Sequence, residues 1–183
     1  MKCSRCSKKA VLSQPYSGLA LCEVHAASDI EAKAKKEIRQ KGGLPSGSTL
    51  YVENDGTFRT FALRIFLAGL LVNRTDVLFV KNPDDTTLVL KPDTLDDVAL
   101  DVLASVCAGT QDQLVSAENM KLAPLSVIPT DEVFWYAKRN GFTGVSPEIP
   151  GDVAEFLESF KIGHPAASYA LKNVRDAIKK ENK

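Results

Sequence analysis

Four potential metal ligands lie close together at the start of the chain, and they constrain it more than any other feature. Cys3 and Cys6 form a C-x2-C pair, and Cys22 and His25 form a C-x2-H pair fifteen residues later. This spacing is typical of a tetrahedral zinc site in which two turns each supply two ligands. The pattern predicts a closed structural zinc knuckle, because four protein ligands leave no open position for a catalytic water.

The segment between the two ligand pairs is predicted to be a β-hairpin, with its turn at Pro15–Gly18. A helix is expected to begin at Ser28 or Asp29 and to end at Gly42-Gly43. Its outer face carries the cations that are candidates for contacting RNA: Lys33, Lys35, Lys36, Arg39 and Lys41. Phosphate contacts supply much of the affinity for nucleic acid, but an ordinary solvated helix face explains this pattern equally well.

The rest of the chain alternates between short strands and helices. Strands are expected over residues 49–53, 77–81 and 87–91, and helices over residues 59–73, 94–107, 131–140 and 166–180. This alternation predicts an α/β fold, a parallel sheet with helices on both faces. We expect a zinc knuckle at residues 1–27, a basic helix and linker at 28–47, and an α/β domain at 48–183.

The composition is that of a globular protein and not of a membrane-spanning one. With 183 residues, 44% hydrophobic and 25% charged, the chain is long enough for one sizeable core. The longest apolar run, residues 61–72, contains Arg64 and falls short of the roughly 20 residues of a membrane span. We expect no membrane partner and no secretory leader, and therefore a cytoplasmic protein. In that reducing compartment, clustered cysteines favour a metal over disulfides. Cys107 lies apart from the cluster and is predicted to be a small core residue.

The loop after the first strand of the α/β region lies where such folds bind phosphates, at the start of a helix. Here Glu53 and Asp55 place carboxylates where a polyphosphate would lie, and Gly56 is the only glycine. Arg59 is a possible phosphate contact, although a solvent-facing position in the first helical turn explains it more simply.

Several segments, in order along the chain, resemble the archaeal and eukaryotic tRNA 2-thiolation ATPases of the TtuA and cytosolic thiouridylase type. The most specific is the opening one, with the C-x2-C pair, Ala10-Val11, the turn at residues 15–18, Leu21-Cys22 and His25. Weaker matches are Thr94–Ala99, Pro129–Tyr136, and Gly163–Pro165 with Ser168–Leu171. The resemblance implies a PP-loop ATPase-like α/β fold.

The resemblance also shows which catalytic parts this sequence lacks. The family's PP-loop would fall on Asp55, Gly56, Thr57, Phe58, Arg59 and Thr60, where only Gly56 and the hydroxyl of Thr60 match. The internal Cys-x2-Cys has no counterpart between Lys81 and Asp93, and a later cysteine of that cluster is also missing. The comparison with the family therefore predicts no iron–sulfur cluster, no persulfide chemistry and no use of ATP.

These expectations lead to a hypothesis about function. By family analogy, the chain is a degenerate pseudoenzyme that supports tRNA thiolation as an accessory subunit, with tRNA and a full-length PP-loop enzyme as partners. For the oligomeric state, a homodimer and a heterodimer are both compatible with the sequence. One alternative is an independent zinc-knuckle RNA-binding module. Another is a divergent nucleotide-binding enzyme using Arg59 or the Asp96-Asp97 pair, although adjacent helical carboxylates diverge too far to act as an acid/base couple.

Overall fold

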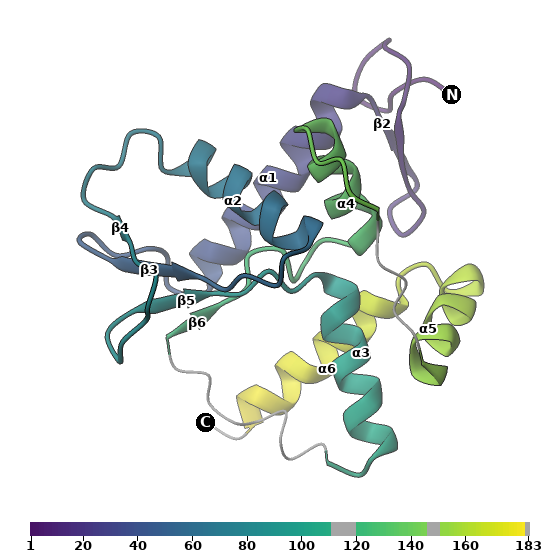
Figure 1. Ribbon diagram of the computed structural model, residues 1–183. Helices are drawn as coiled ribbons and strands as arrows, with labels where there is room; N and C mark the ends of the chain where they lie inside the picture. Colours follow the sequence, from purple (N-terminus) through teal and green to yellow (C-terminus); the bar gives the residue numbers. More distant parts are fainter. Residues whose placement is uncertain (111–119, 146–150, 182–183) are drawn as a thin grey trace. The chain divides into compact units, whose positions relative to one another are not determined.

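The fold is seen in a computed structural model that describes residues 1–110, 120–145 and 151–181 (Figure 1). It contains two compact units. The knuckle unit comprises Met1–Asp29 with helices α3, α5 and α6, and the sheet unit comprises Ile30–Thr94 with strand β6 and helix α4. Neither unit is one continuous stretch of chain, so the structure does not test the expected division at residues 27 and 47.

The knuckle unit joins a hairpin to helices. Strands β1 (Leu12–Gln14) and β2 (Leu19–Leu21) pair antiparallel, with Gly18 at φ 68° in the turn. Helix α1 (Glu23–Gln40) follows directly. Helices α3 (Leu95–Cys107), α5 (Asp152–Gly163) and α6 (Ala167–Glu181) complete the unit. The buried carboxylate of Asp96 links these three helices, because it accepts a hydrogen bond from Ser168 Oγ at 2.7 Å and pairs with Lys161 at 3.1 Å.

The sheet unit holds a four-stranded parallel sheet in the order β4-β3-β5-β6. Its strands are β3 (Thr49–Val52), β4 (Leu78–Phe79), β5 (Leu88–Leu90) and β6 (Lys121–Leu122). Helices α2 (Phe58–Leu70) and α4 (Thr130–Arg139) pack against each other, and the ring centroids of Phe58 and Phe134 lie 5.1 Å apart between them. Fully buried Leu50, Leu63 and Leu90 form part of the core.

The α/β class and the parallel sheet are confirmed, and three details of the sequence prediction are corrected. Helix α1 begins at Glu23, five or six residues before the predicted start, so it carries one of the metal ligands. Helix α4 begins at Thr130 and is preceded by Pro129 at the cap position, so it starts one residue before the predicted residue 131. In the sheet, β4 and β5 lie on opposite sides of β3. Helix α5 and strand β6 were not predicted at all.

Among the residues that the structure describes, no helix has the length and apolar character needed to cross a membrane.

Candidate functional site

The four predicted metal ligands converge on one point of the knuckle unit. The ligand atoms of Cys3, Cys6, Cys22 and His25 all lie within 4.8 Å of one another. Cys6 Sγ is 3.7 Å from Cys22 Sγ, and His25 Nδ1 is 3.4 Å from the Sγ atoms of both Cys3 and Cys22. The chain therefore contains a metal-binding group of three thiols and one imidazole.

Three elements hold these ligands in place. Cys3 and Cys6 lie on a loop closed by an antiparallel bridge between Lys2 and Lys9 and by a 2.8 Å hydrogen bond from Cys3 N to Lys8 O. Cys22 ends the hairpin, and His25 lies in the first turn of α1. That turn begins at Cys22, whose carbonyl accepts a hydrogen bond from Ala26 N at 2.8 Å.

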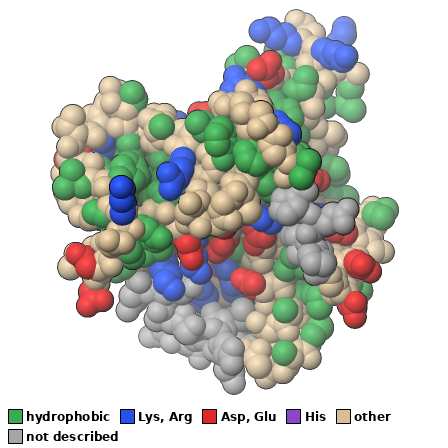
Figure 2. Space-filling model, viewed as in Figure 1, with side chains coloured by type: hydrophobic (Ala, Val, Ile, Leu, Met, Phe, Trp, Pro, Cys, Tyr) green, Lys and Arg blue, Asp and Glu red, His purple; other side chains and the backbone are tan. Residues whose placement is uncertain are grey.

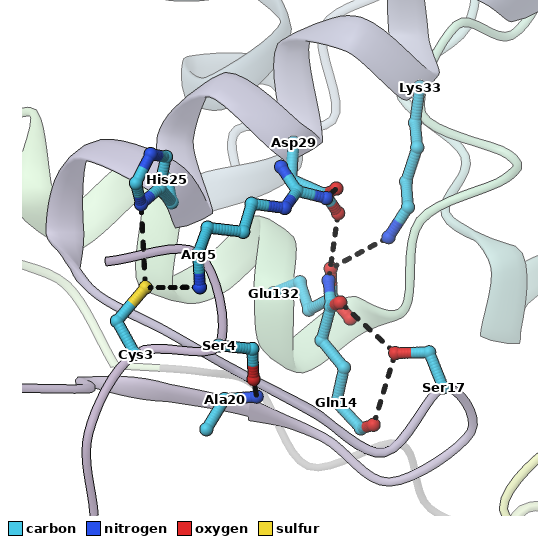
Figure 3. Close-up of polar contacts among 10 residues, drawn as sticks. All are labelled: Cys3, Ser4, Arg5, Gln14, Ser17, Ala20, His25, Asp29, Lys33 and Glu132. Carbon is cyan, nitrogen blue, oxygen red and sulfur yellow. Dashed lines mark hydrogen bonds and ion pairs between the residues drawn. The ribbon is translucent and has the colours of Figure 1, made fainter. Parts of the chain in front are cut away.

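A second layer of contacts fixes the loop to α1 and the hairpin (Figure 3). The carboxylate of Asp29 pairs with Arg5 at 2.6 Å and accepts a hydrogen bond from buried Gln14 at 2.9 Å. Arg5 lies between the first two cysteines, and its backbone N–H points at Cys3 Sγ from 3.4 Å. The position of the first ligand pair therefore depends on an ion pair with α1.

The local environment favours ionisation of one thiol. Burial raises the pKa of Cys3, but hydrogen bonds from the backbone N–H groups of Arg5 and Cys22 and the contact with His25 outweigh it and lower the pKa to about 6. For Cys6, a backbone N–H from Lys8 lowers the pKa, yet burial and the neighbouring thiols Cys22 and Cys3 raise it overall. Thiolate is the form that binds a metal.

The predicted nucleotide loop lies in the sheet unit, between β3 and α2. Asp55, Gly56 and Thr57 form the loop, whereas Phe58 to Thr60 make the first turn of α2. The carboxylate of Asp55 accepts hydrogen bonds from Thr57 N at 2.8 Å, Thr57 Oγ1 at 2.7 Å and Thr60 Oγ1 at 2.7 Å. An acidic side chain of the chain itself thus lies at the helix start, where a bound phosphate would be expected.

The charge of Asp55 is stabilised in this position. Partial burial raises the pKa of its carboxyl, but the hydrogen bonds from Thr60 and Thr57 and the nearby charge of Arg59 lower it overall. Arg59 itself lies with its Cζ 5.1 Å from the centroid of the Phe58 ring. The loop is therefore anionic and is closed by its own hydrogen bonds.

Three comparisons with known proteins bear on these two places. Residues 2–25 match the family described as 2-thiouridine synthetase TtuA, N-terminal LIM domain. A tRNA 2-thiolation protein NcsA of Haloferax volcanii is 29% identical over 86 residues. That match covers 47% of this chain and 24% of the relative.

The fold agrees with these matches. A solved structure described as U34-tRNA thiolase NcsA from Methanococcus maripaludis, with its 4Fe-4S cluster, superposes with a TM-score of 0.84 over 98% of this chain and 87% of that chain, at 14% identity. The chain is a relative of the TtuA family. At 14% identity the structural match shows the fold alone, and the expectation that this TtuA relative holds no iron–sulfur cluster stays a prediction.

The cations expected to contact RNA do not form one free surface in this TtuA relative. Lys33 lies 3.5 Å from the buried carboxylate of Glu132 (Figure 3), and Lys35 lies 3.9 Å from Glu31. Lys36, Arg39 and Lys41 are exposed at or beyond the end of α1. The structure therefore divides the predicted set into two ion-paired lysines and three exposed cations.

The sequence analysis missed a second group of cations in this TtuA relative. Lys2, Arg5, Lys8 and Lys9 are all exposed on the loop that holds Cys3 and Cys6. Figure 2 shows Lys and Arg side chains together at the free end of the knuckle. Lys2, Arg5 and Lys8 recur at every third residue around the C-x2-C pair, and Lys9 follows directly. This spacing was the signal in the sequence that could have identified the group.

The other candidate residues have structural surroundings. Asp96 is buried in the contact with Ser168 and Lys161 described above, where it links helices of the knuckle unit. His164 is exposed, and its ring lies 4.4 Å from that of Phe160. The prediction for Cys107 is wrong: it is exposed, because it lies on the outer side of the last turn of α3, beside exposed Val106.

Proposed function

We propose that this chain is a non-catalytic relative of the tRNA uridine 2-thiolation enzymes, which supports thiolation in the cytoplasm as an accessory or heteromeric subunit. The observation that carries the proposal is the closure of the β3–α2 loop by Asp55. Two further features support it, namely the metal-binding group and the exposed cations of the knuckle.

The closed loop is a poor binding site for ATP. In α/β folds a phosphate is bound by the backbone N–H groups and hydroxyls at the start of the helix. Here Thr57 N, Thr57 Oγ1 and Thr60 Oγ1 already donate to Asp55. A polyphosphate would have to displace a carboxylate that carries the same sign of charge, and like charges at hydrogen-bond distance repel strongly where water is partly excluded.

The metal-binding group fits a single zinc ion. Tetrahedral zinc has Zn–S bonds of about 2.3 Å and Zn–N bonds of about 2.0 Å, which place two sulfurs about 3.8 Å apart and a sulfur and nitrogen about 3.5 Å apart. The corresponding distances here are 3.7 Å and 3.4 Å. A four-iron cluster binds each ligand at a different iron and so holds its ligands farther apart. We therefore assign zinc, which would hold the first loop, the hairpin and α1 together.

The knuckle cations suit contact with the tRNA backbone. Lys2, Lys8 and Lys9 are exposed and lie on one short loop that the metal would keep rigid. A rigid cationic loop loses little conformational entropy when it meets phosphates. Lys36, Arg39 and Lys41 form a second exposed group, and the two groups lie in different compact units.

Affinity purification from the native host at low salt tests the proposal. We expect the tagged full chain to recover tRNA together with a full-length PP-loop thiolation enzyme, and calorimetry with ATP and Mg²⁺ to show no binding. Recovery of RNA without such an enzyme would instead indicate an independent RNA-binding module. Binding of ATP, or recovery of neither tRNA nor the enzyme, would contradict the proposal.

One observation favours a second candidate function, a divergent nucleotide-binding enzyme. A cavity of about 660 Å³ lies at the carboxyl ends of β3 and β4, with Asn54 and Lys81 among its lining residues. Tyr51 and Arg64 also line it, and such a mixture of ring and cation suits a nucleotide. The same calorimetric titration, repeated with AMP, distinguishes two cases. Binding of AMP without ATP indicates a site that recognises only the nucleoside monophosphate, whereas binding of ATP indicates a site that still accepts the triphosphate.

A further inference from the structure

Helix α5 exposes large apolar side chains that the rest of the described chain does not cover. Phe156 is 57% exposed, Phe160 is 44% exposed and Ile162 is 86% exposed. All eight phenylalanines of the chain lie among the described residues, and three of them are exposed. Two of these three lie on α5, and the third, Phe79, lines the cavity at the carboxyl ends of β3 and β4. Exposed clusters of large apolar side chains mark interaction surfaces.

The rings on α5 form one continuous strip. Phe156 and Phe160 are four residues apart and therefore lie on the same side of the helix. Their rings are nearly parallel, with 13° between the planes and 5.7 Å between the centroids. His164 is exposed another four residues along, and its ring lies 4.4 Å from that of Phe160. These three rings, called the α5 strip below, extend along the helix for about 12 Å, the rise of eight helical residues.

Buried contacts hold α5 in place beneath the strip. Ala154 and Leu157 are buried on the other side of the helix. Lys161 pairs with the buried carboxylate of Asp96, on helix α3 of the same unit, at 3.1 Å. Because the helix is anchored in this way, little conformational entropy is lost when another molecule packs on its outer side.

The charges beside the strip are acidic. Asp152, Glu155 and Glu158 are all exposed on α5. Lys161 is the only lysine or arginine of the helix, and its ammonium group is shared between Asp96 at 3.1 Å and Glu158 at 2.9 Å. The outer side of α5 is therefore an apolar strip with a negatively charged border.

A nucleic acid fits this surface poorly. RNA bases stack on exposed faces of aromatic rings, but Phe156 and Phe160 already turn one face each toward the other. The carboxylates of Asp152 and Glu155 would also repel the phosphates of the backbone.

A basic amphipathic helix fits the surface better. The backbone N–H and C=O groups of α5 are paired within the helix, so a partner must pack through side chains and cannot add as a strand. Apolar side chains four residues apart on a partner helix match the spacing of Phe156 and Phe160. Lysines or arginines that flank them would pair with Asp152 and Glu155.

We propose that the α5 strip is a docking surface for a basic amphipathic helix of a partner protein. The apolar side of that helix packs on Phe156, Phe160 and His164, and its cations face Asp152 and Glu155. This inference goes beyond the accessory function proposed above and does not depend on it, because it rests on the surface of α5 alone.

Two synthetic peptides test the surface on the purified full chain. Both are about 15 residues long, enough to form a helix on binding, and carry leucines at i, i+4 and i+7. One has lysines at its other surface positions, and the other has glutamates there. Calorimetry measures affinity, and ¹H–¹⁵N NMR locates the peptide. We expect the lysine peptide to shift the amide signals of Phe156, Phe160 and Ile162 and to bind at least about tenfold more tightly than the glutamate peptide.

The contribution of the rings is measured by a double substitution. Phe156→Ser with Phe160→Ser should weaken binding of the lysine peptide about tenfold or more, because aromatic anchors carry much of the affinity of such contacts. Val72→Ser with Val106→Ser is the matched control, because it removes two exposed apolar side chains away from α5. The control should change the affinity less than about twofold.

The contribution of the acidic border is measured in the same way. Asp152→Asn with Glu155→Gln should weaken binding about threefold at low salt and have little effect at high salt, since salt screens exposed charges. Asp85→Asn with Asp131→Asn is the control, because both carboxylates are exposed away from α5 and Asp131 lies in the first turn of its helix, as Asp152 does.

Several results would overturn the proposal. It is wrong if the lysine peptide does not bind, if the shifted signals lie outside α5, or if the phenylalanine pair can be replaced without loss of affinity. Equal binding of the two peptides would exclude a basic partner. If a single-stranded oligouridine shifts the α5 signals and loses this effect in the Phe156→Ser, Phe160→Ser variant, the strip is an RNA surface instead. Amide spectra establish that all variants are folded.

Discussion

The metal knuckle and the β3–α2 loop are both short turns rich in polar atoms, but those atoms face different partners. In the knuckle, three sulfurs and a nitrogen lie within 4.8 Å of one another, and all four are electron-pair donors. In the loop, the N–H and hydroxyl donors of Thr57 and Thr60 are matched by the carboxylate of Asp55. Converging lone pairs require a cation from outside, whereas a matched set of donors and acceptors has no need of a ligand.

The comparison predicts the largest effect for loss of a knuckle ligand. Cys22→Ser should lower bound zinc from one ion per chain to none and unfold the knuckle, because metal binding contributes about 10 kcal/mol or more to the folding of small zinc sites. Elemental analysis after dialysis measures the metal, and the visible spectrum with Co²⁺ reports its geometry.

Cys107→Ser is the matched control for this substitution. It removes one thiol from an exposed position outside the metal-binding group and should leave the zinc content unchanged. Retention of zinc by Cys22→Ser, or its loss from Cys107→Ser, would contradict the assignment. A cluster spectrum in the purified protein would show that iron and not zinc fills the site.

A smaller effect is expected from the cations of the knuckle. Lys2→Gln, Lys8→Gln and Lys9→Gln together should weaken tRNA binding about tenfold at low salt and reduce the slope of log affinity against log salt, because fewer counterions are released. Filter binding at several salt concentrations measures both quantities.

A second variant removes the same number of positive charges from α1 and the residue after it, and serves as a comparison. Lys36→Gln, Arg39→Gln and Lys41→Gln remove the exposed cations at the end of α1. If this variant weakens tRNA binding more than the knuckle variant does, the RNA contact predicted from the sequence on α1 is the principal one. If neither variant changes the salt slope, phosphate contact by both groups is excluded.

The knuckle and the sheet differ in how much the sequence revealed of them. Cys3, Cys6, Cys22 and His25 were found because metal coordination fixes both residue type and spacing. Strand β3 and helix α2 were found from their apolar periodicity. Strand β6 has only two residues and gains its partner from β5, so no local pattern could indicate it. Helix α5 was missed because only Ala154 and Leu157 are buried, while Phe156 and Phe160 are exposed.

The sequence also gave incomplete information on which side chains form ion pairs and which are exposed. The contact of Lys35 with Glu31 follows the i,i+4 spacing of one helix and could have been predicted from the sequence. No sequence pattern, however, could show that the carboxylate of Glu132 lies beside Lys33. The exposure of Cys107 was hidden as well, because it follows an apolar run but lies at the end of its helix, where the buried face no longer continues. Local periodicity gives the type of an element, and tertiary contacts decide which of its residues are exposed.

The smallest expected effect concerns the closed loop. Asp55→Asn should destabilise the sheet unit by about 1 kcal/mol at pH 7, since charge-assisted bonds at the start of α2 and a favourable interaction with the helix dipole are both weakened. Because the pKa of Asp55 is lowered in the folded protein, its stabilisation is present above the unfolded carboxyl pKa of about 3.9 and is lost as the pH falls through the folded value. The difference from wild type in urea unfolding should therefore narrow below about pH 4.

Asp84 provides the matched control, because its carboxylate accepts an almost identical set of bonds from Thr86 N, Thr86 Oγ1 and Thr87 Oγ1 at 3.0, 2.8 and 2.7 Å. Its pKa is lowered as well, by Thr87 and then Thr86, but no helix begins there. Asp84→Asn should lose only the hydrogen-bond contribution, because Asp84 has no interaction with a helix dipole. Its loss of stability at pH 7 should therefore be smaller than that of Asp55→Asn. High salt should reduce this difference. Equal effects at all salt concentrations would mean that Asp55 closes an ordinary turn and does not take the place of a phosphate at the helix start.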